Sequence, residues 1–154
     1  MNTLIIYDSM YGNTEKIARA IGDGISGEVI IKHVNKVDLS ELKTNSLVIV
    51  GSPTRGFRAS EAIQSFLNTI PKGDLNNIMV AAFDTRMPEQ DVGRGLKIIM
   101  KVGGYAAPRI AKMLEKKGGN LTVPPEGFFV IDREGPLKEG ELERAKEWGR
   151  KISS

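Results

Sequence analysis

The sequence predicts an α/β fold, a doubly wound five-stranded parallel sheet with helices on both faces. Five short apolar runs alternate along the chain with one-faced helical patterns. The runs are apolar at nearly every position, which is typical of strands buried on both faces. Parallel strands that follow one another need crossover connections, which amphipathic helices supply. The length of 154 residues suits a single domain spanning residues 1–154.

The predicted strands are the five apolar runs. In order, they cover residues 4–7, 29–31, 47–50, 78–83 and a broken run from 121 to 130. The broken run contains Pro124 and Pro125, which cannot donate hydrogen bonds to a central ladder. We therefore expect a bulge or two short strands there.

The predicted helices separate these strands. A first helix follows the first run, since Ile17 and Ile21 lie four residues apart on one face. A short link through residues 38–42 joins the second and third runs. We expect Ser60 to cap the second helix and Pro71 to end it. The apolar positions of the later helices are Ile63, Phe66, Leu67 and Ile70, then Ile110, Met113 and Leu114, and finally Leu142, Ala145, Trp148 and Ile152.

One connection is longer than the others. Residues 85–104 exceed the usual length of about 2 to 6 residues, which indicates either a functional loop or a misread helix. Within it, residues 96–102 suit one or two helical turns with an apolar face at Leu96, Ile99 and Met100. That face either packs on the core or forms a lid or partner surface.

Composition excludes several kinds of chemistry. The chain has no Cys and one His, which excludes disulfides, thiol nucleophiles and most zinc sites, so we predict neither a metal site nor a catalytic side chain. Its net charge of +3 is small and dispersed, which argues against nucleic-acid binding. It has no apolar run long enough to span a membrane and no basic region at its start, so we expect a cytoplasmic protein. The oligomeric state stays open.

Ligands of such sheets bind outside the carboxyl ends of the strands, so the loops after the first, third and fourth strands are the candidates. Residues 8–14 are rich in hydroxyls, contain Gly12 and open directly onto a helix, as a phosphate site requires. The alternative is an ordinary turn in which Asn13 or Thr14 caps the helix. The other two loops are residues 51–58, where a tight turn could edge a flat ligand, and residues 83–87.

Taken together, the first two loops resemble those of the flavodoxin-like family. Ser9, Gly12, Asn13 and Thr14 match the family's Ser/Thr-x-Thr-Gly-Asn-Thr phosphate motif, with Tyr11 in place of Thr. Residues 51–54 and Gly56 match the second loop. The resemblance implies the strand order 2-1-3-4-5 and noncovalent binding of flavin mononucleotide (FMN).

The resemblance also implies which residues hold this cofactor. Those expected at the phosphate are Ser9, Met10, Tyr11, Gly12, Asn13 and Thr14, and those expected beside the ring are Pro53, Thr54, Arg55, Gly56, Phe57, Asp84, Thr85 and Arg86. Many flavodoxins stack two aromatic rings on the flavin, whereas these loops supply fewer. Phe57 could cover one face and Met87 or Tyr105 the other, or Phe57 could lie in the core.

Flavodoxins that carry electrons are typically acidic, whereas the arginines Arg55, Arg58, Arg86 and Arg94 lie in or near the ligand loops here. They could contact the flavin, an acidic substrate or an acidic protein, or simply be exposed. Arg55 and Arg86 would favour the reduced, negatively charged flavin.

The leading function is electron transfer with a redox partner protein. The arginines near the ligand loops would suit an acidic partner. One alternative is an FMN-dependent oxidoreductase on a small substrate of the quinone or protoporphyrinogen type. Another is an interaction module of the same fold without flavin. The Gly-x-Gly-x-x-Gly pattern over residues 22–27 ends a helix instead of opening one, so we interpret it as coincidental. We expect His33 to be structural or on the surface.

Overall fold

The computed structural model describes residues 1–88 and 104–154. The expectations for Arg94 and for the apolar face at Leu96, Ile99 and Met100 lie outside the described residues. In chain order the elements are β1 (Asn2–Tyr7), α1 (Asn13–Gly24), β2 (Glu28–His33), the 3₁₀ helices η1 (Val34–Lys36) and η2 (Leu39–Thr44), β3 (Leu47–Pro53), α2 (Glu61–Thr69), β4 (Met79–Arg86), α4 (Ala106–Lys116), β5 (Asn120–Leu121), β6 (Glu126–Phe129) and α5 (Glu141–Ser153).

The strands form one parallel sheet in the order β2-β1-β3-β4-β5, which confirms the predicted order 2-1-3-4-5. The fifth position is shared, because β6 also pairs with β4, beyond the end of β5. The interruption falls at Pro124 and Pro125, where the ladder lacks two N–H donors. The expectation of two short strands is confirmed.

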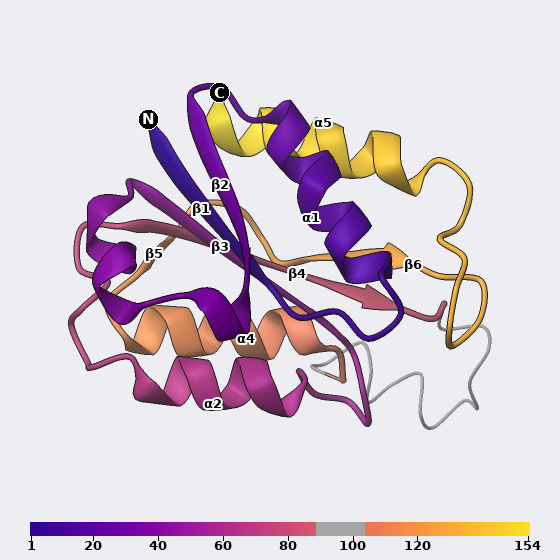
Figure 1. The fold of residues 1–154 in the computed structure, drawn as a ribbon, viewed down its shortest axis with the longest axis horizontal. Helices are drawn as coiled ribbons and strands as arrows, with labels where there is room; N and C mark the ends of the chain where they lie inside the picture. The colour runs from indigo at the N-terminus through magenta and orange to yellow at the C-terminus, as the bar shows by residue number, and fades with distance from the viewer. Residues whose placement is uncertain (89–103) are drawn as a thin grey trace.

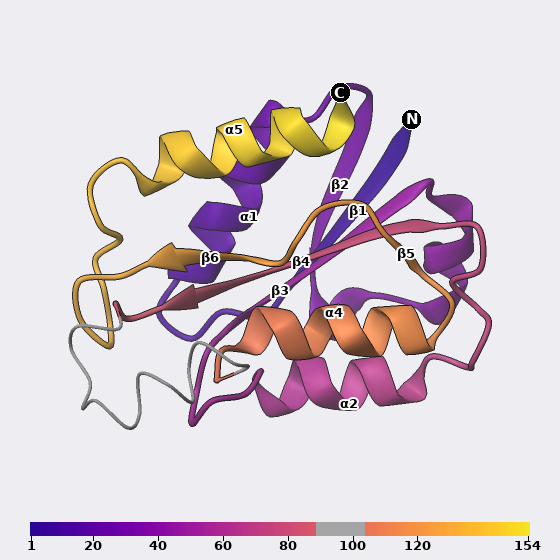
Figure 2. The same ribbon diagram turned by 180° about the vertical axis from the view of Figure 1, so that it is seen from behind.

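Two helical layers cover the sheet. Helices α1 and α5 lie on one face, and α2 and α4 lie on the other (Figures 1 and 2). Successive residues of a strand point to opposite faces, so Ile5 packs in the core beneath α1 and α5, while Leu4 and Ile6 pack beneath α2 and α4. Both cores are apolar, as the near-continuous apolar runs require.

The helix boundaries follow local chemistry. The Ser60 hydroxyl accepts a hydrogen bond from the Ile63 N–H, and α2 ends before Pro71, which confirms both expectations.

On the other face, α1 and α5 approach so closely that a methyl group at Gly149 would collide with the Ile21 carbonyl. A methyl group at Gly24 of α1 would likewise collide with the Lys146 carbonyl of α5, so Gly24 and Gly149 allow these two helices to pack closely.

None of the helices described over residues 1–88 and 104–154 combines the length and the apolar character needed to cross a membrane.

Candidate functional site

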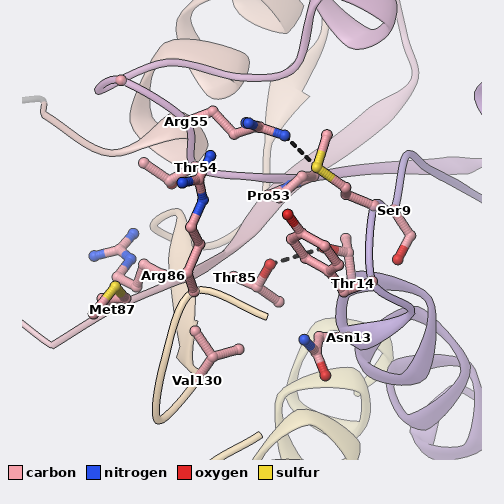
Figure 3. Close-up of a pocket in the computed structure, with 14 residues that line it drawn as sticks. Ser9, Asn13, Thr14, Pro53, Thr54, Arg55, Thr85, Arg86, Met87 and Val130 are labelled. Atoms are coloured by element: carbon pink, nitrogen blue, oxygen red, sulfur yellow. Dashed lines mark hydrogen bonds between the residues drawn. The ribbon is translucent and has the colours of Figure 1, made fainter. Parts of the chain in front are cut away.

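The carboxyl ends of β1, β3, β4 and β6 surround one pocket of about 260 Å³ (Figure 3). Its lining residues are Ser9, Met10, Tyr11, Asn13, Thr14, Pro53, Thr54, Arg55, Gly56, Thr85, Arg86, Met87, Val130 and Arg133. The structure thus brings together most of the predicted site residues. Gly12, Phe57 and Asp84 are the predicted residues that do not line it.

The first loop is shaped by Ser9. The Ser9 hydroxyl accepts hydrogen bonds from the Gly12 N–H (3.0 Å) and the Glu15 N–H (3.4 Å). Gly12 precedes α1 with a φ of 92°, a conformation that disfavours side chains, so its glycine is a requirement of the turn. Gly12 therefore acts through the backbone instead of touching the pocket.

Several backbone donors of this loop are left over. The N–H groups without an acceptor in the described part of the chain are those of Met10, Tyr11, Asn13 and Thr14. They lie beside the N-terminus of α1, which carries a partial positive charge. This arrangement suits an anion that accepts several hydrogen bonds at once.

Asn13 and Thr14 do not serve as helix caps. The Asn13 Nδ2 donates to the Glu134 carbonyl at 3.1 Å, which ties α1 to the loop after β6. The Thr14 hydroxyl lies 2.8 Å from the Thr85 hydroxyl, and both residues are buried (Figure 3). Since one hydroxyl of this pair accepts, its own proton is left to donate to a ligand.

The second loop is a tight hairpin. Arg55 and Arg58 exchange two backbone hydrogen bonds of 2.8 and 3.1 Å, and Gly56 and Phe57 between them have φ values of 52° and 68°. A positive φ at Phe57 is strained, at a cost of about 1–3 kcal/mol. Gly56 lines the pocket, whereas Phe57 is half-buried outside it. The structure therefore does not bring Phe57 to the pocket as the predicted stacking ring.

Asp84 lies inside the sheet because β4 continues to Arg86, past the predicted end at residue 83. Its fully buried carboxylate accepts two 2.7 Å hydrogen bonds from the Arg86 guanidinium and one of 2.8 Å from the Ala107 N–H. The Thr54 hydroxyl accepts from the Ala106 N–H in the same way. Asp84 thus holds the N-terminus of α4 instead of facing a ligand.

Electrostatically, Asp84 and Arg86 balance each other. Burial raises the pKa of the Asp84 carboxyl, and the Arg86 guanidinium opposes this rise. The guanidinium also lies 3.6 Å above the centre of the Tyr105 ring and against the backbone of Gly127. Arg86 lines the pocket, but the buried Asp84 carboxylate already compensates the charge that was expected to favour a reduced flavin.

Val130 and Arg133 line the pocket from the loop after β6, which is not among the three loops predicted to bind a ligand. The Val130 N–H donates to the Arg86 carbonyl at 2.9 Å, so this loop continues the pairing of β6 with β4. Neither Arg133 nor Arg55 forms an ion pair within residues 1–88 and 104–154, although Arg55 contacts the Met10 sulfur. Among the described residues, these two arginines therefore line the pocket without a carboxylate partner.

The sequence matches a known family over most of its length. The family model described as "Flavodoxin domain" matches residues 4–130, and these contain every pocket-lining residue except Arg133. The chain belongs to the flavodoxin family. The loops after β1 and β3 of this flavodoxin domain are the ones whose motifs resemble the family.

The chain is also similar to individual proteins. The chain is 25% identical over 159 residues to a flavodoxin from Clostridium saccharobutylicum, covering 100% of the chain and 96% of that protein. It is 27% identical over 162 residues to an uncharacterized protein from Methanocaldococcus jannaschii, covering 97% of the chain and 36% of that longer protein. The crystal structure of oxidised flavodoxin 2 from Bacillus cereus has the same fold, with a TM-score of 0.77, 22% identity and coverage of 99% and 98% of the two chains.

Proposed function

We propose that this flavodoxin-family protein, acting as one domain over residues 1–154, binds FMN noncovalently and transfers electrons to or from a protein partner. The observation that carries the proposal is the row of unpartnered N–H groups beside the N-terminus of α1. The residues that carry these N–H groups line the same pocket as Pro53, Thr54 and Gly56 of the second loop. The flavin would supply the redox chemistry, and the protein would set its position and potential.

The residues present fit the two ends of FMN. A phosphate needs several donors at one point, and the first loop offers four backbone N–H groups and a hydroxyl of the Thr14–Thr85 pair. A flat aromatic ring needs apolar side chains to pack against, and Pro53, Met87 and Val130 line the pocket. The absorption spectrum of the purified protein tests this fit. Flavin bands, with FMN released on denaturation, would support it, and failure to take up added FMN would refute it.

Thr14→Ala is expected to weaken FMN binding by about 1–3 kcal/mol and to change riboflavin binding little, because the loss concerns a hydroxyl at the phosphate end. Calorimetric titration with both ligands measures this difference. Thr14→Ser is the matched control, since it keeps the hydroxyl. Equal weakening of both ligands by Thr14→Ala would mean that Thr14 acts on folding through Thr85.

Rim charge sets a further expectation. Full reduction of a flavin adds negative charge to the ring, which an uncompensated arginine stabilises by about 1–2 kcal/mol after screening. Arg55→Gln and Arg133→Gln are therefore each expected to lower the one-electron reduction potential of the bound flavin by about 40–90 mV, and less at high salt. Potentiometric titration measures this.

Arg58→Gln is the matched control, because Arg58 is exposed on the same hairpin and does not line the pocket. A potential that changes equally in all three variants, or in none, would show that the arginines do not point at the ring.

Arg55 and Arg133, which have no carboxylate partner in the part of the chain that the structure describes, also favour an acidic partner protein or an anionic substrate. Exposed Met10 and Tyr11 add apolar surface at the pocket, and exposed Ile131 directly follows the pocket-lining Val130, as a docking surface would require. The second candidate function is therefore an FMN-dependent oxidoreductase on a small anionic substrate or a quinone. Turnover of such a substrate with NAD(P)H would favour the enzyme, and salt-sensitive electron exchange with an acidic protein would favour the carrier.

A further inference from the structure

His33 contacts the carboxylate next to the phosphate-binding loop. The parallel register pairs His33, the last residue of β2, with Tyr7, the last residue of β1. Asp8 follows directly, and its Oδ1 lies 3.1 Å from the His33 Nε2. The Tyr7 ring packs edge-on against the imidazole, with 5.5 Å between ring centres. The imidazole is therefore held in place from two sides.

A backbone contact fixes the proton of this imidazole. The Asn35 N–H donates to the His33 Nδ1 at 3.1 Å, at the start of η1. Because Nδ1 accepts, the neutral ring carries its proton on Nε2 and donates it to Asp8. A second proton would go to Nδ1, where it would replace the hydrogen bond from the Asn35 N–H, and it would give the ring a positive charge beside the Asp8 carboxylate.

Asp8 connects the imidazole to the loop. Its Oδ1 also accepts a hydrogen bond of 2.9 Å from the Ser9 N–H, and the Ser9 hydroxyl in turn holds Gly12. The Asp8 N–H donates to the Gly51 carbonyl, which anchors Asp8 to β3. Only the peptide unit of Ser9 thus separates the carboxylate from the loop that offers the free N–H groups.

This position creates a charge conflict. A phosphate bound by the first loop would add up to two negative charges to a loop whose first peptide unit is hydrogen-bonded to the Asp8 carboxylate. A protonated His33, hydrogen-bonded to Asp8, offsets that repulsion, and a ligand that stabilises the protonated form must bind that form more tightly. We propose that His33, acting through Asp8, is a positioning residue that couples imidazole protonation to phosphate binding, an inference that rests on the proposed function.

Two ion pairs lie near the imidazole and include neither His33 nor Asp8. On α1, Arg19 pairs with Glu15 at 2.9 Å. Burial raises the pKa of the neighbouring Tyr7 hydroxyl, Glu15 raises it further, and Arg19 lowers it. Lys32 of β2 pairs with Glu41 of η2 at 2.7 Å. Lys36 lies on η1, beyond Asn35. Within residues 1–88 and 104–154, Asp8 is the carboxyl side chain that is hydrogen-bonded to the imidazole.

The chain has one histidine, so the imidazole signals in an NMR spectrum come from His33 alone. The experiment titrates the protein with pH in three states: free, saturated with FMN and saturated with riboflavin. FMN is expected to move the midpoint of the His33 signals to higher pH, which corresponds to about threefold to tenfold tighter binding by the protonated form. Riboflavin, which lacks the phosphate, is expected to leave the midpoint unchanged.

Calorimetric affinities between about pH 8 and pH 5.5 give a second readout. Phosphate esters themselves titrate near pH 6, so the contribution of His33 is the difference between the wild type and His33→Gln. Gln can donate to Asp8 but cannot titrate. Asp8→Asn keeps an acceptor without the charge and is expected to bind FMN more tightly at the higher pH. Lys32→Gln, on the same strand, is the matched control and should behave as the wild type.

The outcomes separate this inference from the proposed function. If FMN binds far more tightly than riboflavin while the His33 midpoint is the same in both complexes and the profile of His33→Gln follows the wild type, the coupling is overturned and FMN binding stands. If FMN does not bind, the proposed function fails and the coupling fails with it.

Discussion

Arg86→Gln is expected to lower the free energy of unfolding by about 3–5 kcal/mol, because it leaves the buried Asp84 carboxylate without its counter-charge. The loss should shrink as the pH falls. Burial raises the pKa of the Asp84 carboxyl, and without Arg86 nothing charged opposes the rise. The folded variant then binds a proton more readily than the unfolded chain, so its stability increases as the pH falls through the raised pKa. Urea unfolding at several pH values measures both effects.

The double variant Asp84→Asn, Arg86→Gln is the control for this prediction. It removes both charges but keeps a carbonyl oxygen that can accept from the Ala107 N–H. It should therefore recover most of the stability that Arg86→Gln loses. If the double variant is as unstable as the single one, the ion pair is not the cause, and the packing of Arg86 on Tyr105 and Gly127 is.

The fold could be predicted because its signals are local. Apolar runs mark the strands, and the two prolines mark the break between β5 and β6. Ser60 and Pro71 mark the ends of α2 by short-range hydrogen bonding and sterics. Each of these features acts within a few residues, so it can be recognised from the sequence alone.

The site was predicted less completely, because part of it depends on contacts between distant residues. The polar stretch from Asp84 to Arg86 is typical of a loop, yet it continues β4. The buried Asp84 carboxylate is stabilised there by hydrogen bonds from Arg86 and from the Ala107 N–H. Arg133 reaches the pocket because β6 pairs with β4. Its sequence signal is its place in the loop directly after the fifth apolar run.

The pairing of His33 with Asp8 was also missed, since the two residues lie 25 positions apart. The register of β1 with β2 brings their carboxyl ends together, and this register depends on which faces of the two strands are buried. Counting residues from the ends of the two apolar runs would have indicated the contact.

Riboflavin is expected to bind at least a hundredfold more weakly than FMN. The N–H groups of Met10, Tyr11, Asn13 and Thr14 have no acceptor in the described part of the chain, so a phosphate would gain hydrogen bonds that riboflavin cannot make. Charge-assisted hydrogen bonds contribute about 1.5–3 kcal/mol each, and every 1.4 kcal/mol is about tenfold in affinity. Two such bonds already account for a hundredfold.

Calorimetric titration of the flavin-free protein with FMN and with riboflavin, at one pH and salt concentration, measures this ratio directly. Inorganic phosphate serves as the control, since it should compete with FMN and leave riboflavin binding unaffected. The account predicts a ratio of about one hundred or more, with competition by phosphate against FMN alone. Equal affinities for the two flavins would contradict the claim that the loop after β1 binds the phosphate.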